Sequence, residues 1–207
     1  TKGITKAVDD RVLDRILDEA YEKQQLLGLF RPLYRDLIAK AFDEAQRTIP
    51  VDLTIDPDEL DRQALEAVRQ METSILATTS GAVRDIVDKG LAEDWTLAEF
   101  QASIVQSSNF SPSRAMMIAR TETTRHSNKA AIESYKKAER TGLKLEKQWL
   151  SARDANVRDE HRELDGATVP TEALFNYQGS TTEHPGGFGE ARLDINCRCV
   201  TVAKVVN

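Results

Sequence analysis

Hydrophobic residues recur at helical spacing through the first half of the chain. One stripe runs over residues 13–27 and is expected to end at Gly28, and a second follows Pro32. Positions i, i+3 and i+4 lie on one face of an α-helix, so each stripe predicts an amphipathic helix with one buried face. Residues 49–53 include a proline and are expected to form an extended connector.

A strong helix start follows this connector. Asp56 is suited to cap a helix that opens at Pro57, with Glu59 placed to complete a capping box. The apolar stripe then extends over residues 60–87, and we expect the polar and glycine residues at 78–81 to interrupt it.

Two more helices are predicted before the pattern changes. Thr96 and Glu99 have the spacing of a capping box and predict a short helix that contains Leu97, Phe100, Ile104 and Val105. A longer helix is expected over residues 112–141, ending before Gly142. This succession of helical segments is typical of a helix bundle.

Beyond Gly142 the hydrophobic period changes from helical spacing to alternation. Lys147 and Trp149 fall on one face of a strand over residues 143–149, which is the alternating pattern of a half-buried strand. The remaining elements are short and are predicted in this order: a helix at 154–164, a turn at Asp165-Gly166, a strand at 168–170, a loop at 176–190 and a central last strand at 197–206.

These patterns predict an α+β protein. A mostly helical N-terminal bundle, residues 1–110, precedes a small α+β module with a short antiparallel sheet, residues 111–207. The long helix at 112–141 is expected to bridge the two regions.

Composition restricts the functional classes. The chain has 207 residues, is 40% hydrophobic and 30% charged, and carries a net charge of −6, which argues against a protein that coats nucleic acid. No apolar run approaches the roughly 20 residues that span a bilayer, so no membrane partner is expected. The sequence starts with threonine rather than methionine, as expected of a processed or excised polypeptide.

Charge is distributed unevenly along the chain. Residues 111–149 carry 9 basic and 4 acidic side chains. Basic residues on one helix can make phosphate contacts with double-stranded DNA, or they can simply form a solvated helix face. The candidates for DNA contact are Arg125, Lys129, Lys136, Lys137 and Arg140.

The two cysteines stand one residue apart near the end of the chain. In a strand, Cys197 and Cys199 would point to the same face, where their sulfurs could bind one metal ion or pack as small core residues. His161 and His184 would complete a set of four zinc-type ligands. Zinc is therefore one alternative, and a protein without a cofactor is the other.

A second group of candidate residues is polar and charged. Arg120, Glu122 and His161 have the residue types of an anion holder and a general base. The same residues could instead form a salt-bridge network with Asp154 or Asp165. Arg198, between the cysteines, is expected to pair with a nearby carboxylate: Asp154, Asp165 or Asp194.

Several motifs follow one another in a fixed order over residues 112–203. They comprise a helical Ala-Arg-Thr-Glu-Thr segment, a tryptophan strand, a Leu-Asp-Gly turn and a final Asn-Cys-Arg-Cys segment. In this order the C-terminal half resembles the phage Mu F-like head morphogenesis family of minor capsid proteins. The motif residues are Arg120, Thr121, Glu122, Trp149, Asp154, His161, Asp165, Gly166, Asn196, Cys197, Arg198 and Cys199.

One departure from the family pattern concerns the metal. Many family members carry a Cys-x-x-Cys pair between the tryptophan strand and the turn, whereas this chain has residues 156–161, which end in His161. A site of four cysteines is therefore excluded here.

The resemblance implies a role in the phage particle. It implies a virion protein, few in copies, at the portal vertex or capsid interior, which acts in procapsid assembly and DNA packaging or delivery. Before that, it would be present in the host bacterial cytoplasm. The implied partners are the portal protein, other capsid proteins, double-stranded DNA and further copies of the chain. The alternative is a nuclease or transferase that uses Arg120, Glu122 and His161; a role without catalysis is the main prediction.

Overall fold

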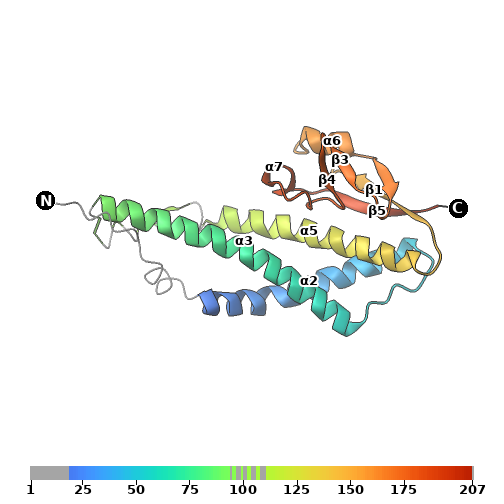
Figure 1. The fold of residues 1–207 in the computed structure, drawn as a ribbon, viewed down its shortest axis with the longest axis horizontal. Helices are drawn as coiled ribbons and strands as arrows, with labels where there is room; N and C mark the ends of the chain where they lie inside the picture. The colour runs from blue at the N-terminus through green and yellow to red at the C-terminus, as the bar shows by residue number, and fades with distance from the viewer. Residues whose placement is uncertain are drawn as a thin grey trace. The chain divides into compact units, whose positions relative to one another are not determined.

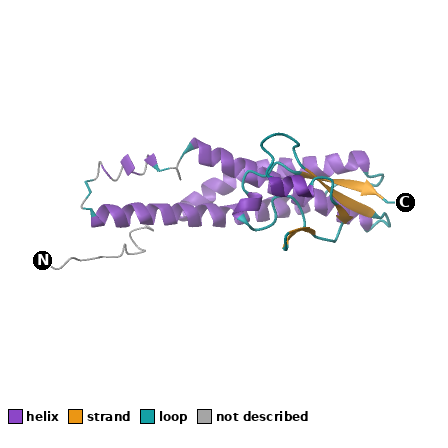
Figure 2. Ribbon diagram, turned by 90° about the horizontal axis from the view of Figure 1, so that it is seen from above, coloured by secondary structure: helices purple, strands orange, loops and turns teal. Residues whose placement is uncertain are grey.

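A computed structural model gives the fold of the chain (Figure 1). The residues that it describes are 19–93, 95–96, 99, 102–103, 106–107 and 111–206. Their elements, in order, are α2 (Glu19–Thr48), α3 (Pro57–Ala92), α5 (Pro112–Glu139), β1 (Leu145–Leu150), α6 (Asp159–Leu164), β2 (Thr168–Pro170), β3 (Phe175–Tyr177), β4 (Ser180–Thr182), α7 (Ala191–Asp194) and β5 (Val200–Val205). Long helices dominate the first part and all strands lie in the last part, which confirms the predicted α+β class (Figure 2).

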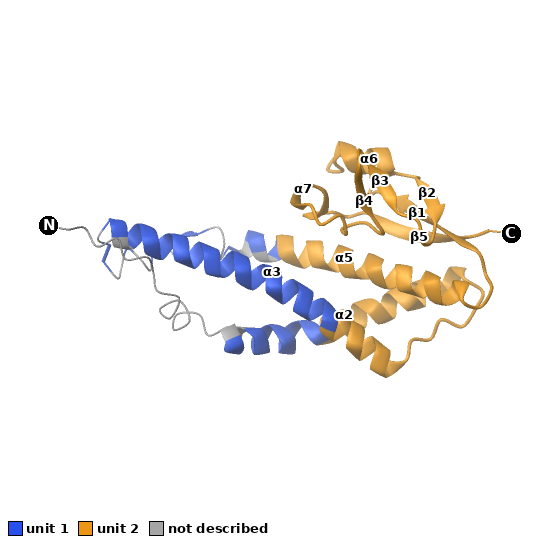
Figure 3. Ribbon diagram, in the orientation of Figure 1, with its two compact units in different colours: residues 1–31, 66–116 blue, residues 32–65, 117–207 orange. Residues whose placement is uncertain are grey.

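The chain divides into two compact units, coloured separately in Figure 3. The first unit consists of residues 1–31 and 66–116, and its described elements are helical. The second consists of residues 32–65 and 117–207 and contains all strands found among the described residues. The end of α2 and the start of α3 thus belong to the same unit as the C-terminal module.

Two predicted helix breaks are wrong. Helix α2 continues through Gly28 and Pro32, although Pro32 cannot donate a backbone hydrogen bond. Buried residues after it, such as Tyr34 and Ile38, show that packing of the apolar face outweighs that one missing bond. The part of the first stripe before Glu19 lies outside the described residues.

Helix α3 is continuous across the expected interruption at residues 78–81. The Thr78 and Thr79 hydroxyls donate to carbonyls one turn earlier, at Ser74 and Ile75, so these polar groups are satisfied within the helix.

The predicted caps are only partly seen. An Asp56 carboxylate oxygen accepts from the backbone N–H groups of Asp58 and Glu59, as predicted for the start of α3. Thr96 and Glu99 make the predicted reciprocal contacts, but Leu97, Phe100, Ile104 and Val105 lie outside the described residues.

The connector between α2 and α3 is held by one side chain. Gln46 donates to the Val51 carbonyl at 2.7 Å and accepts from the Leu53 N–H at 2.7 Å. Ile49 and Leu53 are each only 1% exposed. The extended prediction for residues 49–53 therefore corresponds to a segment that contributes two core side chains.

The main sheet has the strand order β2-β1-β5, and both neighbouring pairs are antiparallel. The alternation on β1 is confirmed, since Leu145, Lys147 and Trp149 are buried and the residues between them are partly exposed. The last strand begins at Val200 rather than Cys197 and is an outer strand, so the predicted central position is wrong. Its apolar residues do not all face the interior, because Val200 is 49% exposed.

A smaller antiparallel pair, β3 and β4, lies in the predicted loop at 176–190. Its Phe175 and Tyr177 join Trp149, Leu164 and Leu193 in the core of the module. Among the described helices, none combines the length and the apolar character that crossing a bilayer requires.

Candidate functional site

Polar side chains on α5 hold the chain segment that contains both cysteines. The Thr121 hydroxyl accepts from the Asn196 N–H at 2.9 Å, and the Thr124 hydroxyl donates to the Cys197 carbonyl at 2.7 Å. Asn196 has a positive φ of 58°, a left-handed conformation that asparagine tolerates better than most residues. The sharp turn at Asn196 is thus fixed on both sides by the helix.

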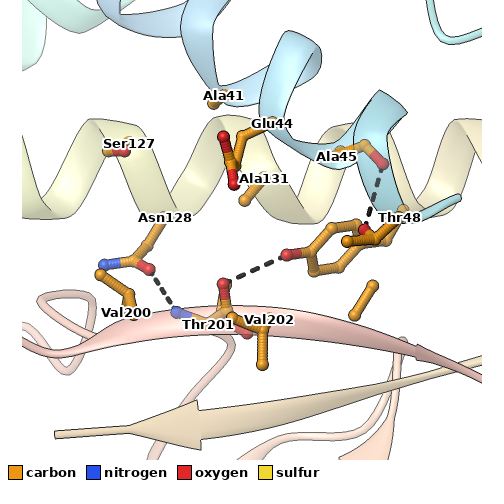
Figure 4. A pocket seen from close by; sticks show the side chains of 12 residues that line it. Ala41, Glu44, Ala45, Thr48, Ser127, Asn128, Ala131, Val200, Thr201 and Val202 are labelled. Carbon is orange, nitrogen blue, oxygen red and sulfur yellow. Dashed lines mark hydrogen bonds between the residues drawn. The ribbon is translucent and has the colours of Figure 1, made fainter.

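One turn further along α5, Asn128 continues this contact into β5. Its amide oxygen accepts from the Thr201 N–H at 2.7 Å (Figure 4). Its amide nitrogen donates to the Cys199 carbonyl at 3.0 Å. Tyr135 then donates to the Thr201 carbonyl at 3.1 Å. Sequence reasoning did not select Asn128, although a helix-disfavouring asparagine beside buried Ala130 is the signal that could have found it.

The two cysteines and His161 form one buried cluster. His161 Nδ1 lies 3.3 Å from Cys199 Sγ and 3.7 Å from Cys197 Sγ. The three donor atoms lie within 4.8 Å of one another, and no other group among the described residues has this metal-ligand spacing. His161 is 3% exposed, Cys199 is 2% exposed and Cys197 is 1% exposed. They offer one nitrogen and two sulfur donors, a set that suits zinc.

The second ring nitrogen of His161, Nε2, contacts the main chain. His161 Nε2 lies 2.9 Å from the Leu193 carbonyl oxygen, which can only accept a hydrogen bond. Arg158 donates to the same carbonyl at 2.9 Å and to the Ile195 carbonyl at 2.9 Å. Arg158 Nη2 lies farther from Nε2, at 3.3 Å, so the shorter contact to the Leu193 carbonyl favours the tautomer with the proton on Nε2 and the Nδ1 lone pair toward the sulfurs.

The two thiols differ in acidity because they are hydrogen-bonded to each other. This contact raises the pKa of Cys197, and burial adds to the rise. The same contact lowers the pKa of Cys199 against the effect of burial, with a further contribution from Trp149.

A small cavity of about 20 Å³ adjoins the cluster. His161 and Cys199 line its inner end, and the partly exposed Arg198 and exposed Asn156 and Asn196 line it toward the surface. A cavity of this volume has room for about one water molecule.

Arg198 makes the expected ion pair, and its partner is Asp154. Two guanidinium nitrogens donate to the two carboxylate oxygens, each at 2.6 Å. Hydrogen bonds from Arg198 hold the pKa of Asp154 at about 2, below its usual range. The pair joins the loop after β1 to the segment between the cysteines.

The other two carboxylates bind backbone N–H groups. Asp165 accepts from the Ser151 N–H at 2.7 Å, which lowers the pKa of Asp165. Asp194 is buried and accepts from the N–H groups of Phe188 and Gly189 at 3.0 and 2.7 Å. Both carboxylates therefore hold loops of the module in place.

Gly166 completes the Leu-Asp-Gly turn. Its φ of 85° lies in the left-handed region that favours glycine, and its N–H donates to the Trp149 carbonyl at 2.8 Å. This motif residue thus connects the turn to the central strand β1.

Arg120, Glu122 and His161 have separate partners. Arg120 is exposed and donates to the Asn196 side chain at 3.4 Å, whereas Glu122 is buried and binds Arg125 at 2.7 Å. Glu122 also lies 3.3 Å from His126 Nε2. The contacts of the described residues do not join Glu122 to His161.

The remaining candidate metal ligand, His184, is buried away from the cysteine cluster. Its Nδ1 lies 3.0 Å from the Pro185 carbonyl, and burial lowers the pKa of the ring. The structure thus brings together three of the four predicted ligands.

Several of the candidate DNA-binding residues have partners within the protein. Arg125 donates to the Gly186 carbonyl at 2.9 Å as well as to Glu122. Lys136 pairs with Glu183 at 2.6 Å, and Lys137 donates to the Thr54 carbonyl. The Arg140 backbone N–H donates to the Lys136 carbonyl at 3.3 Å, and the charge of the partly exposed Lys129 contributes to the lowered pKa of His184.

A larger, mostly apolar pocket of about 290 Å³ lies between α2, α5 and β5 (Figure 4). Small side chains, including Ala41, Ala45 and Ala131, leave this space open. Asn128 and Thr201 form part of its wall, so the pocket borders the hydrogen bonds that hold β5.

Two known proteins are similar to this chain. It is 23% identical over 205 residues to the minor head protein GP7 of Bacillus phage SPP1, covering 97% of this chain and 61% of that protein. It is 35% identical over 116 residues to the NAD(+)–arginine ADP-ribosyltransferase EFV of Enterococcus faecalis, covering 56% of this chain and 24% of that protein. The chain therefore spans less than two thirds of either relative, and no solved structure matches it significantly.

The sequence profile of one protein family matches residues 81–202, well over half of the chain. This match includes all of α5, the cysteine cluster and the Arg198–Asp154 pair. The family is described as Phage Mu protein F like protein, and the chain belongs to it.

Proposed function

We propose that the chain acts as a phage minor head protein that joins the particle at the portal vertex. The observation that carries this proposal is the match to the SPP1 minor head protein, which extends over 97% of the chain and so includes the helical first half. In that role the protein would take part in procapsid assembly and in packaging or delivery of DNA.

The geometry supports a structural role for the motif residues. Asp154, Asp165 and Asp194 bind an arginine or backbone N–H groups of the same module. Thr121 and Thr124 bind the segment that contains the cysteines. Buried polar groups that are all paired favour one arrangement of the loops. A protein that binds neighbouring subunits in a particle needs such a defined surface.

Capsid proteins, including the portal protein, are the partners that we propose. Direct DNA contact receives less support, because Arg125, Lys136 and Lys137 already bind groups within the protein. A net charge of −6 also opposes general binding to a phosphate backbone.

The test is co-assembly. The full chain would be expressed in a bacterial host with the portal, scaffolding and major capsid proteins of its own phage, and particles would be separated by sedimentation. We expect the chain to sediment with procapsids, and we expect its incorporation to fall when the portal protein is omitted.

Two results would contradict parts of this proposal. A chain that stays at the top of the gradient in the presence of all partners would refute the assembly role. Equal incorporation with and without the portal protein would refute the portal association alone. Light scattering of the purified chain tests for a homo-oligomer in the same preparation.

The transferase activity of the enterococcal relative is not extended to this chain, since the aligned segment makes up 24% of that protein. An enzyme built on Arg120, Glu122 and His161 is tested by a nuclease assay that compares the wild type with Glu122→Ala. Metal-dependent cleavage that is lost in the variant would favour the enzyme over the purely structural role.

A further inference from the structure

We propose that His161, Cys197 and Cys199 bind one Zn²⁺ ion, and that the ion fastens α6 to the segment before β5. This inference is independent of the proposed role in the particle. It rests on donor geometry, on the fixed orientation of the histidine and on the adjoining cavity.

The donor spacing agrees with tetrahedral zinc. Zn–S bonds of about 2.3 Å and Zn–N bonds of about 2.0 Å, at tetrahedral angles, separate neighbouring donor atoms by about 3.5–3.8 Å. His161 Nδ1 lies 3.3 Å from the Cys199 sulfur and 3.7 Å from the Cys197 sulfur. An ion can therefore enter with side-chain shifts of a few tenths of an ångström.

The histidine is oriented as a metal ligand would be. Ligating histidines usually donate their second ring N–H to a carbonyl or carboxylate, which fixes the tautomer and the ring plane. His161 Nε2 makes this contact with the Leu193 carbonyl at 2.9 Å. Both sulfurs face Nδ1, so the lone pair of Nδ1 and the two sulfurs can bind the same ion.

The backbone around the cysteines is held before any ion binds. Thr124 fixes the Cys197 carbonyl and Asn128 fixes the Cys199 carbonyl. Ligands that are positioned by their surroundings bind a metal without first paying the cost of ordering a loop.

The fourth coordination position has a place in the structure. The cluster has three protein donors among the described residues, and the adjoining cavity of about 20 Å³ has room for one water. Binding releases the two thiol protons to solvent, so two thiolates, one neutral imidazole and water surround Zn²⁺. This site carries no net charge, which suits its buried position.

Metal content provides the first test. The purified full chain would be reduced, treated with a chelator, loaded with zinc and dialysed against metal-free buffer. We expect one zinc ion per chain by elemental analysis. Zinc at the level of the buffer blank would overturn the proposal, and so would binding of one Cu⁺ ion without any binding of Zn²⁺.

Cobalt substitution tests which residues bind the ion. We expect Co²⁺ to produce thiolate-to-cobalt charge-transfer absorption and the strong visible bands of a tetrahedral site, and we expect Zn²⁺ to abolish both. Cys199→Ser should weaken binding on the order of 100-fold or more, because outer-shell changes alone cost 10–100-fold. His184→Gln is the matched control and should bind as the wild type does.

A wild-type measurement covers the case in which a cysteine variant fails to fold. The rate of alkylation of the two thiols would be compared with and without zinc in mild denaturant. Protection by zinc that is reversed by a chelator supports the site. Equal rates in both conditions would overturn it, as would unchanged cobalt spectra in a folded Cys199→Ser variant.

Discussion

Replacement of Asn128 by alanine should be among the most destabilising single changes in the second unit. The side chain is 3% exposed and makes two bonds to the segment that enters β5. After truncation, the Thr201 N–H and the Cys199 carbonyl lose their partners at a site that water reaches poorly.

The magnitude follows from these two groups. A buried polar group left without a partner costs about 1–3 kcal/mol, so two of them give a loss of about 2–6 kcal/mol. A third bond, from Asn128 to the Thr124 carbonyl at 2.8 Å, adds little, since that carbonyl can still accept from the helix backbone. A loss of about 3–4 kcal/mol is the expected central value.

Urea unfolding followed by circular dichroism measures this loss. The midpoint should fall while the slope with denaturant stays unchanged, because the exposed surface on unfolding is the same. Tyr135→Phe removes one bond to β5 and should cost about 1 kcal/mol. Ser127→Ala, on the same turn of α5, is the control and should stay near the wild type. An Asn128→Ala variant within about 0.5 kcal/mol of the wild type would refute the reasoning.

Three further predictions concern pH and packing. Because the Asp154 pKa is lowered to about 2 by Arg198, its stabilising effect should be lost as the pH falls from about 4 to 2. The free energy of unfolding should therefore fall less steeply with decreasing pH for Asp154→Asn than for the wild type. Equal pH dependence in the two proteins would contradict this. Burial lowers the pKa of Lys147 to about 8. The unfolded chain holds this proton up to about pH 10, so the free energy of unfolding should rise between pH 8 and about 10. Urea unfolding of Lys147→Met should lack this rise. Gly187→Ala should lower the free energy of unfolding by about 1–3 kcal/mol, because its Cβ would lie 2.7 Å from His184. Gly81→Ala has open space around it and should raise the free energy of unfolding by about 0.5–1 kcal/mol. Thermal melts of both variants measure these changes.

Local patterns in the sequence were sufficient to predict much of the fold. Alternation placed Lys147 and Trp149 on the buried face of β1, despite the charge of the lysine. The buried lysine is tolerated because its amine reaches the Glu183 carbonyl at 2.8 Å and lies above the Phe175 ring. The cap at Asp56 was equally predictable, since capping depends on residues close in sequence.

The errors arose where tertiary packing overrides a local signal. Pro32 indicates a helix start in isolation, yet it lies inside α2, whose following turns bury Tyr34 and Ile38. The cysteines looked like part of a strand because apolar residues follow them. Hydrogen bonds to α5, more than 70 residues earlier in the chain, instead hold them in an irregular segment.

The candidate site shows the same limit. Residue types selected His161, His184, Cys197 and Cys199 as candidate metal ligands, and the structure brings three of them together. Sequence could not distinguish the part that His161 plays from that of His184, because their separation depends on the path of the chain between α6 and β5. The role of Asn128 was equally hidden, since a single asparagine in a helix carries no signature of a partner 73 residues away.

The hydrogen bonds from α5 to β5 also determine how this module can meet other proteins. An outer strand with unpaired backbone groups can recruit a strand from another chain, which leads to uncontrolled polymerisation at high local concentration. On β5, Asn128 and Tyr135 already occupy the outward backbone groups of Thr201. At the opposite margin, β2 is only three residues long and ends in Pro170, whose backbone nitrogen has no hydrogen to donate to another strand. The backbone groups of Thr201 on β5 and the position of Pro170 on β2 are therefore unavailable to a strand from another chain, which limits strand exchange at both margins of the sheet.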